Sequence, residues 1–393
     1  MTVATLEPTL QTTKPTKAEV PVVVNEFWTS KQRAAHSLHE VSYRACFKPQ
    51  LPRYFIERFS ETGDAVLDPF MGRGTTLIEA ALHGRVPIGV DANPLCASLA
   101  RPRLNPPDEH SVKQRLAEID FSAQSDCPED LLVFFHPETL RGIGALRGYL
   151  KHREATGQID PVDDWIRMVA LNRLTGHSPG FFSVYTLPPN QAVSVASQRK
   201  INERLRQTPT RRDVPLLILK KSKALLADLT PEDLERLDGV RKKARVLHGS
   251  ATSLGTLQPE SVQLAVTSPP FLDTVDYVSD NWLRSWFAGV NLEDGSLSVF
   301  RCLDEWTKNM TLALAECRRV LVSGGHLAFE VGEVRGGRVR LEENVLYAGE
   351  VAGLKPIQVM INSQQFTKTS NCWGVSNGTK GTNTNRIVVF QKP

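Results

Sequence analysis

The first regular pattern of apolar positions lies between residues 65 and 100. Residues 65–67 form a short apolar run that predicts a buried strand, and residues 75–83 carry apolar side chains at helical spacing. Residues 87–91 predict a second strand with Asp91 at its tip, and residues 93–100 predict a second helix. This alternation predicts a βαβ unit with parallel strands.

The pattern changes in the middle of the chain, between about residues 106 and 243. Helical stretches there are followed by a loop rich in aromatic residues and proline, residues 177–191. Residues 199–245 then hold fourteen Lys and Arg against seven Asp and Glu. We interpret this part as a helical, basic insertion. Its expected helices include residues 131–135, 138–151 and 163–174.

The strand pattern resumes at residues 244–247 and again at residues 262–267, which lead directly into Ser268. Strands and helices that alternate on both sides of an insertion predict an α/β fold with a doubly wound, Rossmann-like sheet. Later elements are expected as helices at 281–288 and 312–321, a glycine turn at 324–325, and strands at 326–331 and 386–390. The expected units are a flexible arm over residues 1–24, half of the sheet domain over 25–105, the insertion over 106–243 and the other half over 244–393.

Charge and cysteine content narrow the class of protein. The formal net charge of +4 is too small to indicate a nucleic-acid partner, so the local excess of basic residues is more informative. The six cysteines are widely spaced, with no C-x-x-C pair and no histidine at metal-ligand spacing. That spacing favours reduced thiols and no metal. No apolar run approaches the roughly 20 residues of a membrane helix, and no signal peptide pattern is present. We expect a soluble, cytoplasmic protein.

Two short motifs carry the candidate chemistry. Residues 66–76 read VLDPFMGRGTT, an apolar strand that runs into a glycine turn and a helix start, and residues 267–271 read TSPPF. Each motif alone is a weak signal, because glycine turns and double prolines are common. The pair resembles the amino-group DNA methyltransferases, in which a DPFxGxGTT segment binds S-adenosylmethionine and an S/N/D-P-P-aromatic segment methylates an exocyclic base amine. In that family Ser-Pro-Pro favours the N4 of cytosine, and Asp-Pro-Pro favours the N6 of adenine.

The resemblance implies S-adenosylmethionine as cofactor. The two glycines of the turn would let the backbone approach it closely, and the threonines at the helix start would offer hydroxyls to its carboxylate. Asp68 could accept from its ammonium group, and Asp91 lies at the offset at which such folds bind a ribose. Ser250 stands where the family often carries an acid near the adenine. The expected cofactor-binding residues are Phe47, Asp68, Phe70, Gly72, Gly74, Thr75, Thr76, Asp91 and Ser250.

The second motif supplies the expected catalytic loop, Ser268, Pro269, Pro270 and Phe271. The amine of cytosine is a poor nucleophile because its lone pair is delocalised into the ring. The Ser268 hydroxyl and the Pro269 carbonyl could accept the two amine hydrogens and direct the nitrogen at the methyl group, so catalysis would rest on positioning. Phe271 would supply an aromatic face for a base that has left the duplex stack.

DNA recognition is expected to fall to the insertion. Its basic segment, residues 199–245, suits phosphate contacts, although for any single residue there a solvated helix face is the more common reading. Candidates for base-edge contacts are Asn190, Gln191, Gln198 and Arg199. Residues that could lie near a flipped base are Asp273, Asp276, Tyr277, Trp373 and Asn377, against the alternative of polar loops.

The sequence therefore predicts a cytosine-N4 methyltransferase acting on double-stranded DNA, in a restriction–modification or solitary setting. A partner restriction endonuclease fits that setting, and the sequence leaves the oligomeric state open. Three alternatives stay open: adenine N6 as the acceptor, an exocyclic amine of RNA, and a non-catalytic DNA-binding subunit. Ser268 argues against the first, and the intact motifs argue against the last.

Overall fold

The computed structural model describes residues 20–25, 35–44, 46–186, 192–272, 276–292, 300–334, 338–363 and 384–393. Within these ranges, no helix has the length and apolar character needed to cross a membrane. The five cysteines in the same ranges carry free thiols.

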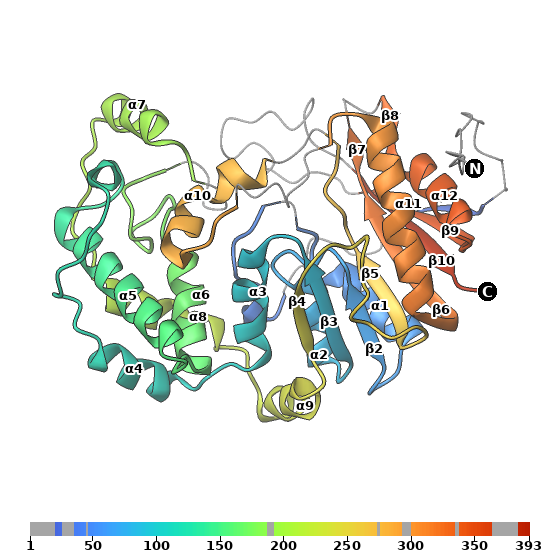
Figure 1. Ribbon diagram of the computed structural model, residues 1–393, viewed down its shortest axis with the longest axis horizontal. Helices are drawn as coiled ribbons and strands as arrows, with labels where there is room; N and C mark the ends of the chain where they lie inside the picture. Colours follow the sequence, from blue (N-terminus) through green and yellow to red (C-terminus); the bar gives the residue numbers. More distant parts are fainter. Residues whose placement is uncertain are drawn as a thin grey trace, which may run out of the picture.

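An eight-stranded sheet forms the centre of the molecule, in the order β1-β9-β10-β6-β5-β2-β3-β4 (Figure 1). Every neighbouring pair is parallel except the two that involve β10, which runs antiparallel to both β6 and β9. The strands are β1 Val22–Asn25, β2 Ala65–Asp68, β3 Val86–Asp91, β4 Arg245–His248, β5 Val262–Thr267, β6 Leu321–Val331, β9 Lys355–Ser363 and β10 Thr384–Gln391. A small separate ribbon pairs β7 Glu333–Val334 with β8 Val339–Arg340.

Helices cover both faces of this sheet, which confirms the predicted doubly wound α/β class. The α-helices are α1 Gln50–Phe59, α2 Thr75–Leu82, α3 Pro94–Ala100, α4 Glu109–Glu118, α5 Pro137–Ala155, α6 Pro161–Leu171, α7 Val195–Leu205, α8 Val214–Leu225, α9 Pro231–Arg241, α10 Tyr277–Ala288, α11 Leu303–Val320 and α12 Leu341–Val351. Short 3-10 helices span Ser37–His39, Arg101–Leu104 and Glu129–Val133.

The two faces of the sheet build separate cores because successive strand side chains point in opposite directions. On β2, Val66 joins a buried cluster with Phe55 of α1, whereas Leu67 joins a cluster with Trp306 of α11. All four side chains are fully buried. The strand order reverses between β2 and β5, so the first turn after each of these strands opens at the same edge.

The middle of the chain forms a helical lobe beside the β4 edge, as the sequence predicts. Figure 1 shows α4 to α8 gathered there, with α10 between this lobe and the sheet. Trp165 of α6 is fully buried and donates its indole N–H to Ser222 of α8 at 2.9 Å. The lobe therefore has a core of its own that fixes its helices.

Two parts of the fold differ from the sequence prediction. Residues 22–24, assigned to a flexible arm, lie in β1 and pair in parallel with β9. Neither β9 nor α12 was predicted, although together with β10 they complete the far side of the sheet. Apolar valines in a short run are compatible with an arm or a strand, and only the partner β9 decides between them.

Candidate active site

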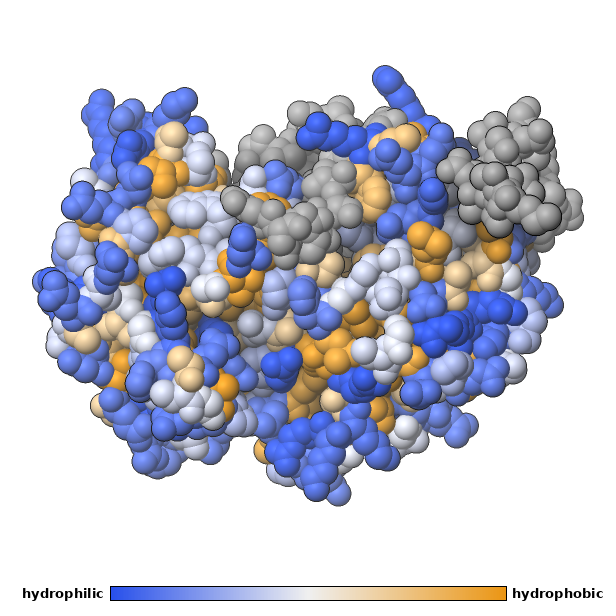
Figure 2. Space-filling view, viewed as in Figure 1, coloured by the Kyte–Doolittle hydropathy of each residue, from blue (hydrophilic) through white to orange (hydrophobic). Residues whose placement is uncertain are grey.

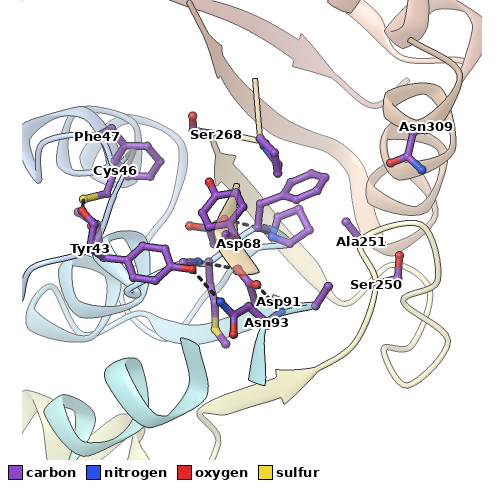
Figure 3. Close-up of a pocket in the computed structure, with 18 of the residues that line it drawn as sticks. Tyr43, Cys46, Phe47, Asp68, Asp91, Asn93, Ser250, Ala251, Ser268 and Asn309 are labelled. Atoms are coloured by element: carbon purple, nitrogen blue, oxygen red, sulfur yellow. Dashed lines mark hydrogen bonds between the residues drawn. The ribbon is translucent and has the colours of Figure 1, made fainter. Parts of the chain in front are cut away.

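A pocket opens where β2, β3 and β5 end, at the carboxyl edge of the sheet (Figure 3). This is the edge at which doubly wound sheets bind ligands, beside the point where the strand order reverses. Residues from the two sequence motifs therefore meet there although they are about two hundred positions apart. The expected residues that line the pocket are Phe47, Asp68, Phe70, Gly72, Thr75, Asp91, Ser250, Ser268 and Pro270.

The glycines of the first motif have two different roles. Gly72 has a φ of 49° and Gly74 a φ of 81°, in the left-handed region that favours glycine. Gly72 lines the pocket, whereas a Cβ on Gly74 would lie 2.7 Å from the Cβ of Ala100. Gly74 therefore allows α2 to begin directly against α3, and the structure does not bring it to the pocket.

Asp91 is held rigidly at the tip of β3. One carboxylate oxygen accepts from the backbone N–H of Gly72 and the other from that of Asn93, each at 2.8 Å. Burial raises the pKa of Asp91, and the two backbone donors act in the opposite direction. The carboxylate keeps free lone pairs on both oxygens, which suits two neighbouring hydroxyl donors.

Asp68 lies deeper, at the end of β2, and its side chain is almost fully buried. Its Oδ1 accepts from the Thr267 hydroxyl at 2.6 Å and from the backbone N–H of Phe70 at 3.1 Å. Burial raises the pKa of Asp68 to about 7, against these hydrogen bonds. A cationic ligand group would favour its ionised form, so this carboxylate is suited to bind an ammonium group.

We expect Asp68→Asn to stabilise the free protein more at pH 8 than at pH 5. The pKa of Asp68 is higher in the folded state, about 7, than in the unfolded chain, so folding costs more as the pH rises between those values. Asparagine removes this cost, which amounts to up to about 3 kcal/mol between pH 5 and 7. Thermal unfolding at the two pH values measures the difference.

The matched control is Asp108→Asn, at the N-terminus of α4. Hydrogen bonds from Ser111 lower the pKa of Asp108, so its contribution to stability is lost only as the pH falls below the ordinary range of a carboxyl. Its effect should be the same at pH 5 and pH 8. A constant effect for Asp68→Asn as well would show that Asp68 is already ionised in the folded protein at pH 5.

The loop expected to be catalytic, residues 268–271, is held by contacts on both sides. The Ser268 side chain interacts with Glu330 of β6, a buried carboxylate that also accepts from the Asn385 amide at 2.6 Å. Burial raises the pKa of Glu330. On the other side, the indole N–H of Trp306 donates to the Pro270 carbonyl at 2.8 Å. When the Ser268 hydroxyl donates to Glu330, its oxygen lone pairs are left to accept other hydrogens.

Two tyrosines that the sequence did not clearly assign line the pocket. The Tyr43 hydroxyl accepts from the Asn93 amide at 3.1 Å, and its ring is stacked on that of Tyr277, with centroids 6.1 Å apart. Figure 3 shows Tyr43 beside Asp91 and Asn93. Tyr277 begins α10 one residue after its cap, Asp276, which accepts from Ser279. Asp276 thus orders the helix that presents Tyr277.

Several expected residues point elsewhere. Thr76 is fully buried and does not line the pocket; its hydroxyl donates to the Val266 carbonyl at 3.1 Å, which joins α2 to β5, and its side chain also interacts with the Asp68 carboxylate. Phe271 packs against the apolar cluster around α11, and Pro269 is buried without lining the pocket. Ser250 lines the pocket, but its hydroxyl closes a local turn with Thr252 at 2.8 Å. These orientations depend on packing, which the motif alone does not show.

The candidates for DNA recognition divide in the same way. Gln198 is fully buried and donates to the Tyr185 carbonyl and to Asn202, so it stabilises the helical lobe. Arg199 is exposed and forms an ion pair with Asp130 at 2.9 Å. The remaining candidates, Asn190, Gln191, Asp273, Trp373 and Asn377, lie outside the described residues.

The donor set fits S-adenosylmethionine. The buried carboxylate of Asp68 suits an ammonium group, Asp91 suits a ribose diol, and the Thr75 backbone and hydroxyl lie at the positive end of α2, which suits a carboxylate. Fold and site are therefore those expected of a protein that binds S-adenosylmethionine. The comparisons with known proteins then narrow this class.

Residues 6–101 match the family model described as DNA methylase, for N6 and N4 amino-group enzymes. Type II methyltransferase M.MjaII of Methanocaldococcus jannaschii is 35% identical over 91 residues, which are 23% of this chain and 17% of that protein. Type II methyltransferase M.MvaI of Kocuria varians is 27% identical over 111 residues, 28% of this chain and 23% of that protein. Over residues 6–101 the chain is similar to this amino-methyltransferase family, which supports S-adenosylmethionine as its cofactor.

The matched region is short, since the chain spans only 17% and 23% of the length of these two curated relatives. Among solved structures, a putative DNA modification methylase of Thermus thermophilus, complexed with S-adenosyl-L-methionine, is 22% identical. That alignment covers 37% of this chain and 54% of the other, with a TM-score of 0.24.

Proposed function

We propose that the protein transfers a methyl group from S-adenosylmethionine to an exocyclic amine of a base in DNA, with cytosine N4 as the acceptor. The observation that carries this proposal is the pocket that joins Ser268 and Pro270 to the carboxylates Asp68 and Asp91. The family description, DNA methylase, and the relatives named as Type II methyltransferases support DNA as the substrate.

For this reaction the protein has to position the acceptor amine relative to the methyl group of the cofactor. S-adenosylmethionine supplies an electrophilic methyl group on its sulfonium when it is bound. Ser268, which interacts with Glu330, would offer oxygen lone pairs to one amine hydrogen. By the resemblance, the Pro269 carbonyl would accept the other. Two such acceptors hold the nitrogen lone pair out of conjugation and in line with the methyl group.

The pocket also suits a flat ring that enters from outside. Its lining includes the aromatic side chains Phe47, Phe70, Tyr277 and Phe300. A base that leaves the duplex needs such faces to replace its lost stacking. Phe271 is half-buried and does not line the pocket, so we assign the stacking face to these pocket residues.

Ser268 is also the reason for preferring cytosine N4. A carboxylate at this position is typical of adenine N6 enzymes, and here the loop carries a neutral hydroxyl. Glu330 brings a carboxylate to the same place indirectly, through its interaction with Ser268. We place the protein in the cytoplasm, in a restriction–modification or solitary-methylase setting.

The helical lobe is the proposed DNA-recognition region, but its basic residues fall into two groups. The backbone N–H of Ala192, just before α7, donates to the backbone carbonyl of Asp280 in α10, so the segment that leads into α7 is joined to the helix that presents Tyr277 to the pocket. In contrast, Arg236 of α9 donates to the Leu82 carbonyl at the end of α2 that is remote from the pocket. Figure 1 shows α9 at the opposite edge of the sheet, and Figure 2 shows hydrophilic side chains over it.

A second cavity lies in the lobe, between α5 and the start of α8. Arg141, Arg211 and Arg212 line it, with Glu138 and Asp213 as the acidic neighbours. Glu138 is paired with Arg211 at 2.7 Å, and Asp213 caps α8. The Nε atom of Arg212 is buried without a hydrogen-bond partner among the described residues. A phosphate oxygen would satisfy this donor, so we assign these arginines to the DNA backbone.

We expect the double variant Arg141→Ala/Arg212→Ala to weaken DNA binding and its salt dependence. Each lost phosphate contact lowers the slope of log K against log salt by about 1. The matched control, Lys242→Ala/Lys243→Ala beyond α9, removes the same charge at the opposite edge of the sheet. Fluorescence anisotropy with a labelled duplex from low to moderate salt measures both slopes. If the two double variants had equal slopes of log K against log salt, Arg141 and Arg212 would not contact the DNA backbone as proposed.

The test of the function is mass spectrometry of nucleosides after incubation of duplex DNA with the protein and deuterium-labelled S-adenosylmethionine. Label in N4-methylcytosine is the expected result. Label in N6-methyladenine would keep the site and reverse the choice of acceptor. Label only in RNA, offered in parallel, would overturn DNA as the substrate, and no label in either would overturn catalysis.

A further inference from the structure

The resemblance would place the adenine of the cofactor near Ser250, where the family often carries an acid. Ser250 stands at that position, and its hydroxyl is engaged by the Thr252 side chain and backbone N–H, at 2.8 and 3.2 Å. The carboxylates that line the pocket, Asp68 and Asp91, are placed for other parts of the cofactor. An adenine amine would therefore need another acceptor at this end.

A side chain from α11 reaches this part of the pocket. Asn309 lines the pocket together with Ser250 and Ala251. Figure 3 shows its amide on the same side as these two residues, away from Phe47 and Tyr43. The Asn309 side chain is half-buried and makes no hydrogen bond with any residue that the structure describes. A half-buried amide in a pocket offers one acceptor and two donors to a ligand.

Helix α11 is fixed to both neighbouring parts of the site. Trp306, one turn before Asn309, donates to the Pro270 carbonyl of the catalytic loop at 2.8 Å. Glu316, two turns after Asn309, accepts from the backbone N–H of Leu254 at 2.6 Å. Arg319 adds hydrogen bonds to the carbonyls of Leu254 and Leu257, at 2.8 and 3.0 Å. The segment that carries Ser250 and Ala251 is thus tied to α11.

The spacing of these residues along α11 shows which face of the helix carries Asn309. Positions three, four and seven residues apart lie on one face of an α-helix, so Trp306, Asn309 and Glu316 share a face. Through Trp306 this face contacts the loop 268–271, and through Glu316 it contacts the 250–257 segment. The two positions are about 15 Å apart along the helix axis. Asn309 lies between the two anchors and faces the pocket between them.

We propose that Asn309 reads the adenine of S-adenosylmethionine, its Oδ1 accepting from the 6-amine and its Nδ2 donating to a ring nitrogen. A planar amide makes this pair of hydrogen bonds with an adenine edge. Asn309 takes over the role that the family gives to the acid at the position of Ser250. The inference rests on the proposed function only through its cofactor.

The test is calorimetric binding of two ligands without any methyl acceptor. One is S-adenosylhomocysteine, and the other is its analogue with unsubstituted purine, which lacks the 6-amine. The wild-type protein should bind the first about 10-fold more tightly than the second, because one hydrogen bond to the amine is lost. Asn309→Ala should reduce this preference to about 2-fold or less, whereas Asn309→Asp, which keeps an acceptor oxygen, should retain it.

Thr311→Ala is the control on the same helix, because the Thr311 hydroxyl donates only to the Thr307 carbonyl, at 2.9 Å. It should keep the wild-type preference. If Asn309→Ala kept that preference too, or if the wild-type protein showed none, the proposal would be wrong. A wild-type protein that binds neither ligand would overturn the cofactor as well. If the protein binds with the expected preference but the mass spectrometry finds no label in any nucleic acid, this inference is supported and only the proposed function is wrong.

Discussion

Replacing Ser268 with alanine should lower kcat for methyl transfer by at least about 100-fold, the scale of losing one aligned polar group at a reacting centre. Ser268 lines the pocket and interacts with the buried Glu330, and a hydroxyl that donates to this carboxylate keeps oxygen lone pairs to accept other hydrogens. The dissociation constant of S-adenosylhomocysteine should change little, because the carboxylates at the ends of β2 and β3 stay in place. Single-turnover kinetics and calorimetry separate the two quantities.

Ser261→Ala provides a control at the other end of the same strand. Its hydroxyl donates to the Gln258 carbonyl at 2.6 Å, on the edge of the sheet away from the pocket. The control should keep wild-type turnover and a wild-type melting temperature. Near-normal turnover in Ser268→Ala would remove the proposed role of the hydroxyl, and an equal loss of cofactor affinity would make Ser268 a binding residue.

Replacing Asp91 with alanine should weaken cofactor binding by about 100-fold, the effect of losing charge-assisted hydrogen bonds in a buried site. Asp91 is aligned by the backbone N–H groups of Gly72 and Asn93, so its removal also frees the turn that approaches the cofactor. Asp91→Asn keeps an acceptor oxygen and should lose less. Calorimetric titration with S-adenosylhomocysteine gives both values.

The control for Asp91 is Asp64→Ala, in the turn that precedes β2. Asp64 accepts from the backbone N–H of Glu61 at 2.7 Å, at the opposite edge of the sheet, and its replacement should leave cofactor affinity unchanged. If Asp91→Ala bound the ligand as tightly as this control, the ribose would have to be bound by another group. Asn93 would then be the next candidate, because it also lines the pocket.

The first βαβ unit and the catalytic loop were predictable because their signals are local. A buried strand, a glycine turn and a helix start follow one another within eleven residues, 66–76, and β5 runs without interruption into Ser268. Chain order and the parallel arrangement of strands then bring the two motifs to one edge. Most of the expected pocket residues do line the pocket for this reason.

The basic segment shows where sequence reasoning stopped. Residues 199–245 form one run of positive charge along the chain. The fold divides that run between α7, whose preceding segment is hydrogen-bonded to α10 at the pocket, and α9, which packs at the far end of α2. The sequence does not show on which side of the fold each basic residue lies. The parts of residues 199–245 near the pocket and far from it could therefore be distinguished only in the folded structure.

The sequence by itself determined the α/β class, the cofactor turn and the loop that contains Ser268, since each depends on contacts between near neighbours in the chain. Only the tertiary structure decided that Thr76 and Phe271 do not line the pocket, that Glu330 lies beside Ser268, and that Asn309 reaches the pocket. These outcomes depend on which faces of distant helices and strands are buried together. That choice is made by close packing over the whole domain, and no local pattern records it.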